Sequence, residues 1–382
     1  MSAPIILKVE SAKRKSCVRC LLPTLFLLSA ALFIGTAFVI TDYKEKVWEW
    51  ATFDFVKDNT MKICETQQRP RGTEKLPRGI ISATSDLEMR PLWGHRDKSL
   101  KKPKNLLAMA VGIKQKQNVN KIVEKFLSSD FIVMHFHYDG IVDEWRDLEW
   151  SSHAIHIVAN NQTKWWFAKR FLHPDIVSEY DYIFLWDEDI GVDYLNPRRY
   201  ISIIKEEGLE ISQPALDPNV SEVHHLMTAR LQGTTVHRRV NKKIGRSRCD
   251  QNATGYPCSG FVEMMAPVFS KASWQCVWHM IQNDLVHGWG VDFQLGYCAQ
   301  GDPNKNIGVV DSEYIIHYGL PTLGGSASDK AQPLSKQPKD RQTVKNWSLV
   351  ELEVFKNRWR RAVSKDNCWT DQYQQSPNQK KS

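Results

Sequence analysis

The stretch Tyr180–Ile190, YDYIFLWDEDI, decides the fold class because an apolar run passes directly into three acids. The run is short and rich in aromatic and β-branched residues, which predicts a strand rather than a helix. Its apolar residues do not alternate with polar ones, so we expect both faces of this strand to be buried. Strands of this kind are typical of the sheets of α/β proteins.

The three acids at the end of the strand predict a metal site. Side chains alternate along an extended chain, so Asp187 and Asp189 point to one side and Glu188 to the other. Two close carboxylates repel each other, whereas a hard divalent cation favours the charged form of both. Oxygen ligands indicate Mn²⁺ or Mg²⁺. The alternative is a solvated turn or a cap, and Glu188 is expected to serve local structure.

Residues 105–325 predict one Rossmann-like domain, a mixed α/β sheet flanked by helices. Apolar strand patterns alternate there with amphipathic ones, in the order NLLAMAVG, NVNKIVEKFLSS, FIVMHFHYDG, AIHIVAN and TKWWFAKRFLHPDIV. Ligands of such sheets bind beyond the carboxyl ends of the strands, where Asp139 falls. Asp139 is therefore predicted to bind the base or ribose of a nucleotide, although loop acids are common. Neither a G-x-G-x-x-G nor a P-loop is present, so a usual NAD or FAD site has little support.

The N-terminal part predicts a membrane anchor. Residues 21–40 carry no charge, and their length suits a helix that crosses a bilayer. Basic residues precede them, so the positive-inside rule places residues 1–20 in the cytosol and the rest in the lumen. The alternative is a cleaved signal peptide, but the apolar stretch is long and lacks a clear cleavage site.

Two further segments flank the predicted domain. Residues 41–104 become polar and proline-containing, which predicts a stem without a packed core. Residues 326–382 form a polar extension with one amphipathic helix, NWSLVELEVFKNRWRRAV. In that helix Ser348 and Glu351 have the spacing of an N-terminal capping box.

Glycosylation signals and cysteines agree with a lumenal domain. Asn-x-Ser/Thr sites, all after the anchor, are Asn161, Asn219, Asn252 and Asn346. Six of the eight cysteines also follow the anchor, which suits disulfides, and about fifteen pairings are possible. Sequence separation favours Cys249 with Cys258 and Cys276 with Cys298. The absence of a lumenal C-x-x-C pair makes a cysteine zinc site weak.

The charge pattern argues against nucleic acid as a partner. The formal net charge is +8, and no basic block is interleaved with aromatic residues as a nucleic-acid groove requires. A paired-Asp strand end in the secretory pathway instead indicates binding of a diphosphate through a cation, which stabilises a departing nucleoside diphosphate. The sum of these features predicts a glycosyltransferase.

Four motifs resemble the plant family of type II membrane proteins called domain of unknown function 707. They are WDEDI, YPCSGFVEMMAPVFSKASW, HGWGVDFQLGYCA and IGVVDSEYIIHYGLPTLG, within about residues 105–325. The resemblance implies a fold similar to the nucleotide-diphospho-sugar transferases of the GT-A type. Some members carry the label "lysine-ketoglutarate reductase trans-splicing related", which does not suit a chain anchored in the membrane.

The resemblance to GT-A enzymes implies roles for further residues. His317 would be a third metal ligand, although a histidine after an apolar run is often a hydrogen-bonded wall residue. Asp292 would take the proton from the acceptor hydroxyl, or serve as the N-cap of the helix that it opens. Residues 256–261 resemble the acceptor-side loop of such enzymes, with Glu263 close by.

The helix pattern TKWWFAKR contributes basic residues to the predicted donor site. Lys164, Lys169 and Arg170 are candidates for the pyrophosphate, although some of them must be ordinary solvent-facing charges. The aromatic residues between them, 165–167, are expected in the core.

The sequence thus predicts a single-pass type II membrane glycosyltransferase of the Golgi. It would use Mn²⁺ or Mg²⁺, a sugar nucleotide as donor and a glycan or protein as acceptor. One alternative is a membrane-anchored lumenal binding or scaffold protein with the same fold and no turnover. Another is a metal-dependent hydrolase that uses the same carboxylates.

Overall fold

The computed structural model describes the second of two compact units of the chain, residues 68–382. Within it the described residues are 70, 72–81, 105–221, 223–240, 243–244, 247–249, 256, 258–320, 339–371 and 373. The predicted anchor, residues 21–40, and most of the predicted stem lie outside these residues. Among the described helices, none is both long and apolar enough to span a bilayer.

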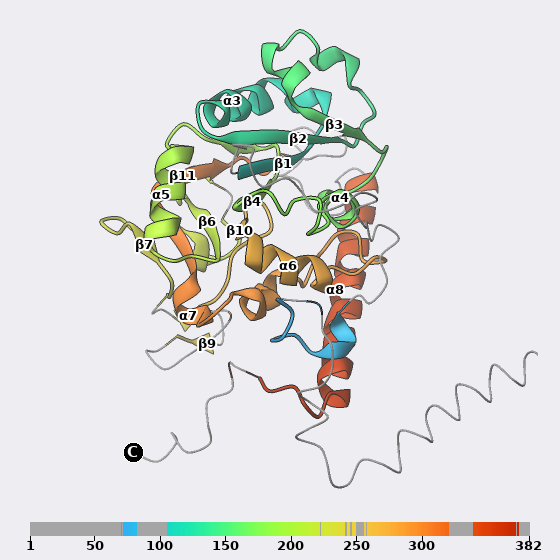
Figure 1. Ribbon diagram of the computed structural model, residues 1–382, viewed down its shortest axis with the longest axis vertical. Coiled ribbons are helices and arrows are strands. Elements are labelled where there is room, and N and C mark those ends of the chain that lie inside the picture. The colour runs from blue at the N-terminus through green and yellow to red at the C-terminus, as the bar shows by residue number, and fades with distance from the viewer. Residues whose placement is uncertain are drawn as a thin grey trace, which may run out of the picture. The chain divides into compact units, whose positions relative to one another are not determined.

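A nine-stranded mixed sheet forms the centre of this unit (Figure 1), in the order β3-β2-β1-β4-β10-β6-β11-β5, with β7 paired to β11. Its first four strands are parallel: β1 (Asn105–Val111), β2 (Phe131–His137), β3 (Ile155–Val158) and β4 (Tyr182–Trp186). The others are β5 (Ile190–Gly191), β6 (Ile211–Leu216), β7 (Val236–His237), β10 (Val268–Ser270) and β11 (Ile307–His317). β10 runs antiparallel to β4 and β6, and β11 is parallel to β6. A separate ribbon joins β8 (Lys243–Ile244) to β9 (Ser247–Arg248).

Helices cover both faces of the sheet, which confirms the predicted mixed α/β class. The α-helices are α3 (Lys116–Leu127), α4 (Lys164–Phe171), α5 (Pro197–Glu206), α6 (Lys271–Met280), α7 (Pro303–Asn306) and α8 (Lys339–Lys365). The 3-10 helices are η1 (Arg78–Ile80), η2 (Ile113–Gln115), η3 (Asp143–Trp145), η4 (Glu149–His153), η5 (Leu226–Thr228) and η6 (Asp292–Cys298). Apolar residues of α3 and α5 pack on one face, and those of α4, α6 and α8 pack on the other.

The opening stretch forms β4, which lies between β1 and β10 near the centre of the sheet. Phe184 and Trp186 belong to the core under α3, where the ring of Phe126 lies 5.5 and 5.2 Å from theirs. Ile183 and Leu185 belong to the core on the opposite face. Each such side chain contributes about 1.5–3 kcal/mol through burial. The prediction of a strand buried on both faces is therefore confirmed.

The segment 72–81 differs from the predicted stem because it packs into the domain core. Leu76 and Ile80 are fully buried together with Phe355 and Trp359 of α8. Local composition is polar here, but two apolar residues suffice to attach a short segment to an existing core. The compact unit accordingly extends beyond both ends of the predicted domain, residues 105–325.

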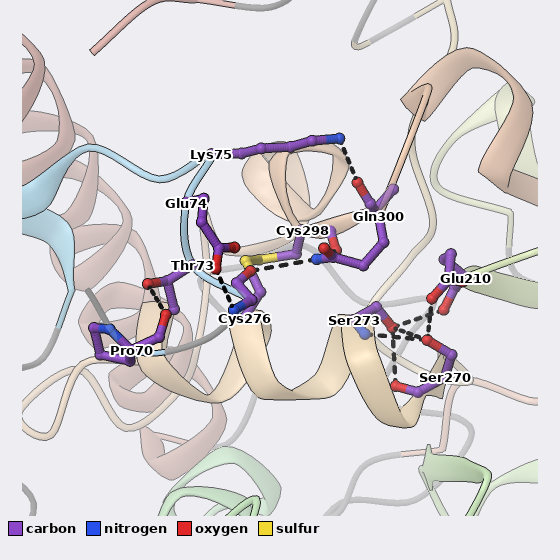
Figure 2. The surroundings of a disulfide bond; sticks show 12 residues. Pro70, Thr73, Glu74, Lys75, Glu210, Ser270, Ser273, Cys276, Cys298 and Gln300 are labelled. Carbon is purple, nitrogen blue, oxygen red and sulfur yellow. Dashed lines mark hydrogen bonds between the residues drawn. A yellow bond between two sulfur atoms is a disulfide. The ribbon is translucent and has the colours of Figure 1, made fainter. Parts of the chain in front are cut away.

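The two favoured disulfides, Cys249–Cys258 and Cys276–Cys298, are both present. Figure 2 shows the second one, which joins α6 to the end of η6 beside the segment that carries Thr73 and Lys75. The Lys75 ammonium donates to the Ala299 carbonyl at 2.9 Å, next to this bond. Cys368 is also disulfide-bonded.

The predicted capping box of the last helix does not form. α8 begins at Lys339, so Ser348 lies inside the helix and donates to the Val344 carbonyl at 2.9 Å. Glu351 instead pairs with His287, whose backbone N–H and Nδ1 both lie 2.8 Å from its carboxylate. The Ser-x-x-Glu spacing was therefore misleading, because a serine hydroxyl inside a helix can bond the carbonyl four residues earlier.

Candidate functional site

Asp187 follows β4 at the carboxyl end of the parallel strands and is the most open acid of the group. Its side chain is 39% exposed, and its Oδ1 lies 2.7 Å from the Lys164 ammonium. The same ammonium donates to the Met264 carbonyl at 2.6 Å. The Asp187 backbone N–H donates to the Met265 carbonyl at 2.7 Å, which fixes where the strand ends.

Asp189 is buried and belongs to the same site. Its Oδ2 accepts the Leu320 backbone N–H at 2.7 Å and lies 3.5 Å from Nε2 of His317. Burial raises the pKa of Asp189, and the nearby Asp187 raises it further, while His317 and the Leu320 N–H act in the opposite direction. The charge of Asp187 therefore acts on Asp189, as it also does on Glu188.

β11 brings His317 to the paired acids. In the antiparallel pairing of β5 with β11, His317 lies opposite Ile190, directly after Asp189. The His317 backbone N–H donates to the Ser221 hydroxyl at 3.1 Å. The predicted third ligand thus lies beside Asp189, although the two are far apart in sequence.

Glu188 has different partners from Asp187 and Asp189, and it joins the ends of β1 and β2. Its Oε2 accepts the Gly112 N–H at 2.7 Å, and the Tyr138 hydroxyl donates to its Oε1. A side chain at position 112 would collide with the Tyr138 ring and hydroxyl, so a larger residue there would have to displace Tyr138. Burial raises the pKa of Glu188 to about 8, with smaller contributions from Asp189 and Asp187 in the same direction and from its hydrogen bonds in the opposite one.

Asp139 lies at the carboxyl end of β2, as predicted, but both of its oxygens accept backbone hydrogen bonds. Oδ2 accepts the Ile113 N–H at 2.7 Å and Oδ1 accepts the Ile141 N–H at 3.0 Å. Asp139 therefore shapes the loops after β1 and β2. Its binding of a nucleotide stays a prediction.

The two lysines of α4 differ, and Lys169 does not join the acids. Its ammonium is buried, donates to the Trp278 carbonyl at 2.7 Å and lies 3.6 Å from the centre of the Trp278 ring. Burial lowers the pKa of Lys169 to about 7. Arg170 lies over the Trp166 ring at 4.1 Å. Lys164 therefore reaches the site from α4 through its ion pair with Asp187.

A second acidic group contains Asp292 and Glu263. Asp292 is the first residue of η6, and its Oδ1 accepts the N–H groups of Gly290 and Phe293 at 3.2 and 3.0 Å. The N-cap position itself is Val291. Burial raises the pKa of Asp292 to about 6, while these hydrogen bonds and the charge of Lys356 lower it. Burial also raises the pKa of Glu263 to about 7; Asp292 adds to this, and the bond from Thr228 opposes it.

Aromatic rings lie next to these acids. The Tyr256 ring is 4.8 Å from that of Phe261 and 4.6 Å from that of Phe293, and His225 is 4.8 Å from Phe261. Burial raises the pKa of Tyr256, and the charges of Asp292 and Glu263 raise it further. We call Tyr256, Phe261, Phe293 and His225 the aromatic cluster.

The two acidic groups are connected through the loop before η5. The ring of His224 lies 6.0 Å from that of His317, and the next residue, His225, belongs to the aromatic cluster.

Sequence reasoning missed a cluster of three histidines, His135, His137 and His156. Each offers a ring nitrogen within 4.8 Å of those of the others. The H-x-H spacing in FIVMHFH was the available signal, because residues two apart on a strand share a face.

Comparisons with known proteins identify a family. A family model described as "Protein of unknown function (DUF707)" matches residues 67–365. No curated protein matches the chain.

Solved structures with partial similarity include TarS (residues 1–349) from S. aureus, with 11% identity and a TM-score of 0.33. The mannosyltransferase Ktr4p from S. cerevisiae has 10% identity and a TM-score of 0.23. The glycosyltransferase GlyE from Streptococcus pneumoniae TIGR4 has 9% identity and a TM-score of 0.31. The match to TarS covers 56% of this chain and 59% of that one, and the match to Ktr4p covers 43% and 51%. The match to GlyE covers 71% of this chain and 66% of that one. This chain thus spans less than two thirds of the length of TarS and of Ktr4p.

Proposed function

Since this chain belongs to the DUF707 family, whose description names no activity, we propose its function from the site itself. We propose that it is a metal-dependent glycosyltransferase of GT-A type that moves a sugar from a nucleoside-diphosphate donor to a glycan or protein acceptor. Asp187, Asp189 and His317 would hold the cation, and Asp292 would act on the acceptor.

The observation that carries this proposal is the pair of acids that follows β4, with His317 3.5 Å from Asp189 and Lys164 2.7 Å from Asp187. Two carboxylates and one imidazole suit Mn²⁺ or Mg²⁺. Burial first, and the charge of Asp187 second, raise the pKa of Asp189, and a bound cation would offset both effects. A bound cation would supply Lewis-acid stabilisation of the departing diphosphate. Because the Asp187 side chain is partly exposed, a diphosphate can approach it from the solvent.

Lys164 supports the same proposal through its charge. Its ammonium lies 2.7 Å from Asp187 although the lysine side chain is only 7% exposed. Because this ammonium is already held in place, the lysine side chain loses little further conformational entropy when it binds a phosphate oxygen. Lys164 would therefore orient the diphosphate, while Asp187 holds the lysine in place before the donor binds.

The second acidic group suits the acceptor. A carboxylate whose pKa is about 6, as for Asp292, is largely ionised at neutral pH and more basic than an ordinary aspartate, which favours proton removal from a hydroxyl. The aromatic cluster provides flat apolar faces against which the C–H face of a sugar ring can pack. Glu263, with a pKa of about 7, is partly protonated and would donate a hydrogen bond to an acceptor oxygen.

A lumenal location is part of the proposal. The disulfides Cys249–Cys258 and Cys276–Cys298 support an oxidising compartment such as the Golgi lumen. The glycosylation sites Asn161, Asn219 and Asn346 are all exposed, as attachment of a glycan requires.

One observation favours a second candidate, a lumenal protein that binds without turnover. Because Lys164 already pairs with Asp187, the charge of this acid is offset without a cation. Such a protein would bind a nucleotide equally well with and without Mn²⁺, and would release no diphosphate from a sugar nucleotide.

Titration calorimetry on the detergent-solubilised full-length chain tests the proposal. UDP and GDP are titrated with and without Mn²⁺ into the parent, Asp187→Asn and the control Asp193→Asn, which changes an exposed acid nearby. We expect binding of one nucleotide only with Mn²⁺, retained in the control and at least about 100-fold weaker in Asp187→Asn. Metal-independent binding by the parent, or unchanged binding by Asp187→Asn, would contradict the proposed metal site. Sugar-nucleotide turnover then separates a transferase from a binding protein, and release of free sugar rather than transfer would indicate a hydrolase.

A further inference from the structure

The three histidines lie at the β3 edge of the sheet, away from the centre of β4. His135 and His137 project from one face of β2, and His156 lies on β3 opposite His135 in the parallel register. The rings are close, with centroids 5.0 Å apart for His137 and His156 and 5.9 Å apart for His135 and His156. The sheet itself therefore fixes three imidazoles in one place.

Two tryptophans cover this histidine cluster. The rings of Trp145 and Trp150, from η3 and η4, lie 5.8 and 5.1 Å from that of His135. His135 and His137 are fully buried, whereas His156 is half-buried. The cluster is therefore closed on the side of His135 and opens toward the edge of the sheet at His156.

The buried histidine His135 has an unexplained feature. Neither of its ring nitrogens has a hydrogen-bond partner within the described part of the chain, although the side chain is fully buried. Leaving a buried polar group unsatisfied costs about 1–3 kcal/mol. Buried groups of this kind call for a specific explanation, such as an ion that the side chain coordinates.

The hydrogen bonds of His156 define which of its nitrogens can bind an ion. Its Nε2 lies 2.9 Å from the Ser151 carbonyl, which only accepts, so Nε2 carries the proton. Its Nδ1 then presents a lone pair toward Nε2 of His137, 2.8 Å away. A metal-binding histidine ordinarily donates its other N–H to a carbonyl in this manner.

We propose that His135, His137 and His156 form a binding site for a divalent transition metal of the zinc class. Three imidazoles suit Zn²⁺ much better than the hard cations that bind carboxylates. Zn–N distances of about 2.0–2.1 Å place two ligand nitrogens roughly 3.3 Å apart in a tetrahedral site. The three nitrogens lie within 4.8 Å of one another, so small ring rotations complete the geometry.

Binding requires no net loss of protons from the histidines. In the hydrogen-bonded pair, Nε2 of His137 donates to Nδ1 of His156. When an ion takes the lone pair on Nδ1 of His156, the proton on Nε2 of His137 moves to Nδ1 of the same His137 ring. Nε2 of His137 then becomes a ligand. The ion thereby clamps edge strand β3 to β2, with a water molecule as the fourth ligand on the open side.

Metal titration of the chelator-treated full-length chain tests this proposal. We expect one equivalent of Zn²⁺ in the parent, and a visible Co²⁺ absorption spectrum of a nitrogen-rich tetrahedral site when Co²⁺ is added instead. His156→Gln and His137→Gln should each weaken Zn²⁺ binding by at least about 100-fold. The matched control is His153→Gln, which removes an exposed histidine next to the cluster.

The double variant Asp187→Asn/Asp189→Asn separates this site from the proposed catalytic one and should bind Zn²⁺ as the parent does. The inference is overturned if the parent binds no Zn²⁺ in stoichiometric amount, or if His156→Gln and His137→Gln bind it as tightly as His153→Gln. Circular dichroism checks that each variant is folded. If a histidine variant unfolds, the Co²⁺ spectrum of the parent decides, because it reports nitrogen ligands without any substitution; an octahedral, water-like spectrum would refute the site.

Discussion

Nε2 of His317 lies 3.5 Å from Oδ2 of Asp189, because β11 pairs with the short strand β5 that follows the acidic turn. The same Asp189 oxygen accepts the Leu320 N–H, so the segment after β11 is attached to this acid as well. The end of β4 and the end of β11 therefore form one site, and this relationship yields the first prediction.

His317→Gln should weaken Mn²⁺-dependent nucleotide binding by about 10–100-fold, because glutamine is a poor substitute for an imidazole ligand. Calorimetry with UDP and GDP measures the effect. The control is His224→Gln, which changes an exposed histidine whose ring lies 6.0 Å from that of His317. Equal losses in both variants would mean that His317 has no specific role as a ligand.

Asp292→Asn should leave nucleotide binding intact and slow sugar transfer by about 100-fold or more, the scale of a lost general base. The pKa of Asp292 is about 6, so its carboxylate form increases as the pH rises through 6. The transfer rate of the parent should therefore rise between about pH 5 and pH 7, and that of the variant should not. A parent rate that is flat over this range would remove Asp292 as the base.

Glu188→Gln should change how stability depends on pH. Burial raises the pKa of Glu188 from 4.5 to about 8, so the folded chain holds a proton that the unfolded chain releases. Between these two pH values the stability contribution of this group falls as pH rises, by on the order of 5 kcal/mol in total. Glutamine cannot ionise, and its amide can still accept from Gly112 and donate to the Tyr138 oxygen.

Urea unfolding of the parent and Glu188→Gln from pH 5 to pH 8 measures this difference. The parent should lose stability relative to the variant as pH rises. The raised pKa of Glu263 makes the stability of both proteins fall slightly with pH, so this effect does not separate them. Glu124→Gln, at an exposed position of α3, is the control and should behave as the parent does. Parallel curves for the parent and Glu188→Gln would show that Glu188 is ionised in the folded chain.

Replacing both Cys276 and Cys298 by alanine should lower the free energy of unfolding by about 3 kcal/mol, because the bond closes a loop of 22 residues. Both cysteines are fully buried, so alkylation of the native chain without reductant should not modify them. Denaturant unfolding and mass spectrometry measure the two effects. Rapid modification of Cys276 in the native chain would contradict the disulfide.

A tag placed before Lys8 should be degraded by protease in intact Golgi vesicles, because the basic residues before the predicted anchor favour the cytosol. The four sites Asn161, Asn219, Asn252 and Asn346 should lie inside the vesicles, and a glycan on any of them should be removed by a glycosidase only after the vesicles are opened. Single Asn→Gln variants identify each modified site by its loss of mass. A protected tag together with no glycan at any site would invert the predicted topology.

Local sequence was sufficient where the physical cause is local. Alternation along a strand predicted different surroundings for Glu188 and for its two neighbours, and Glu188 bonds Gly112 whereas Asp187 pairs with Lys164. Short separations identified both described disulfides. The apolar run at residues 182–186 likewise determined a strand covered on both faces. These features depend only on residues close to one another in the chain.

Tertiary structure decided the features that depend on what lies opposite a residue. Lys164 and Lys169 share one helix, but only the packing of α4 sends the first to Asp187 and buries the second against Trp278. The three histidines meet because the register of β2 and β3 aligns His135 with His156. A one-residue shift of that register would turn one set of side chains to the other face of the sheet. Register depends on contacts across the whole core, and the order of residues along one strand does not contain it.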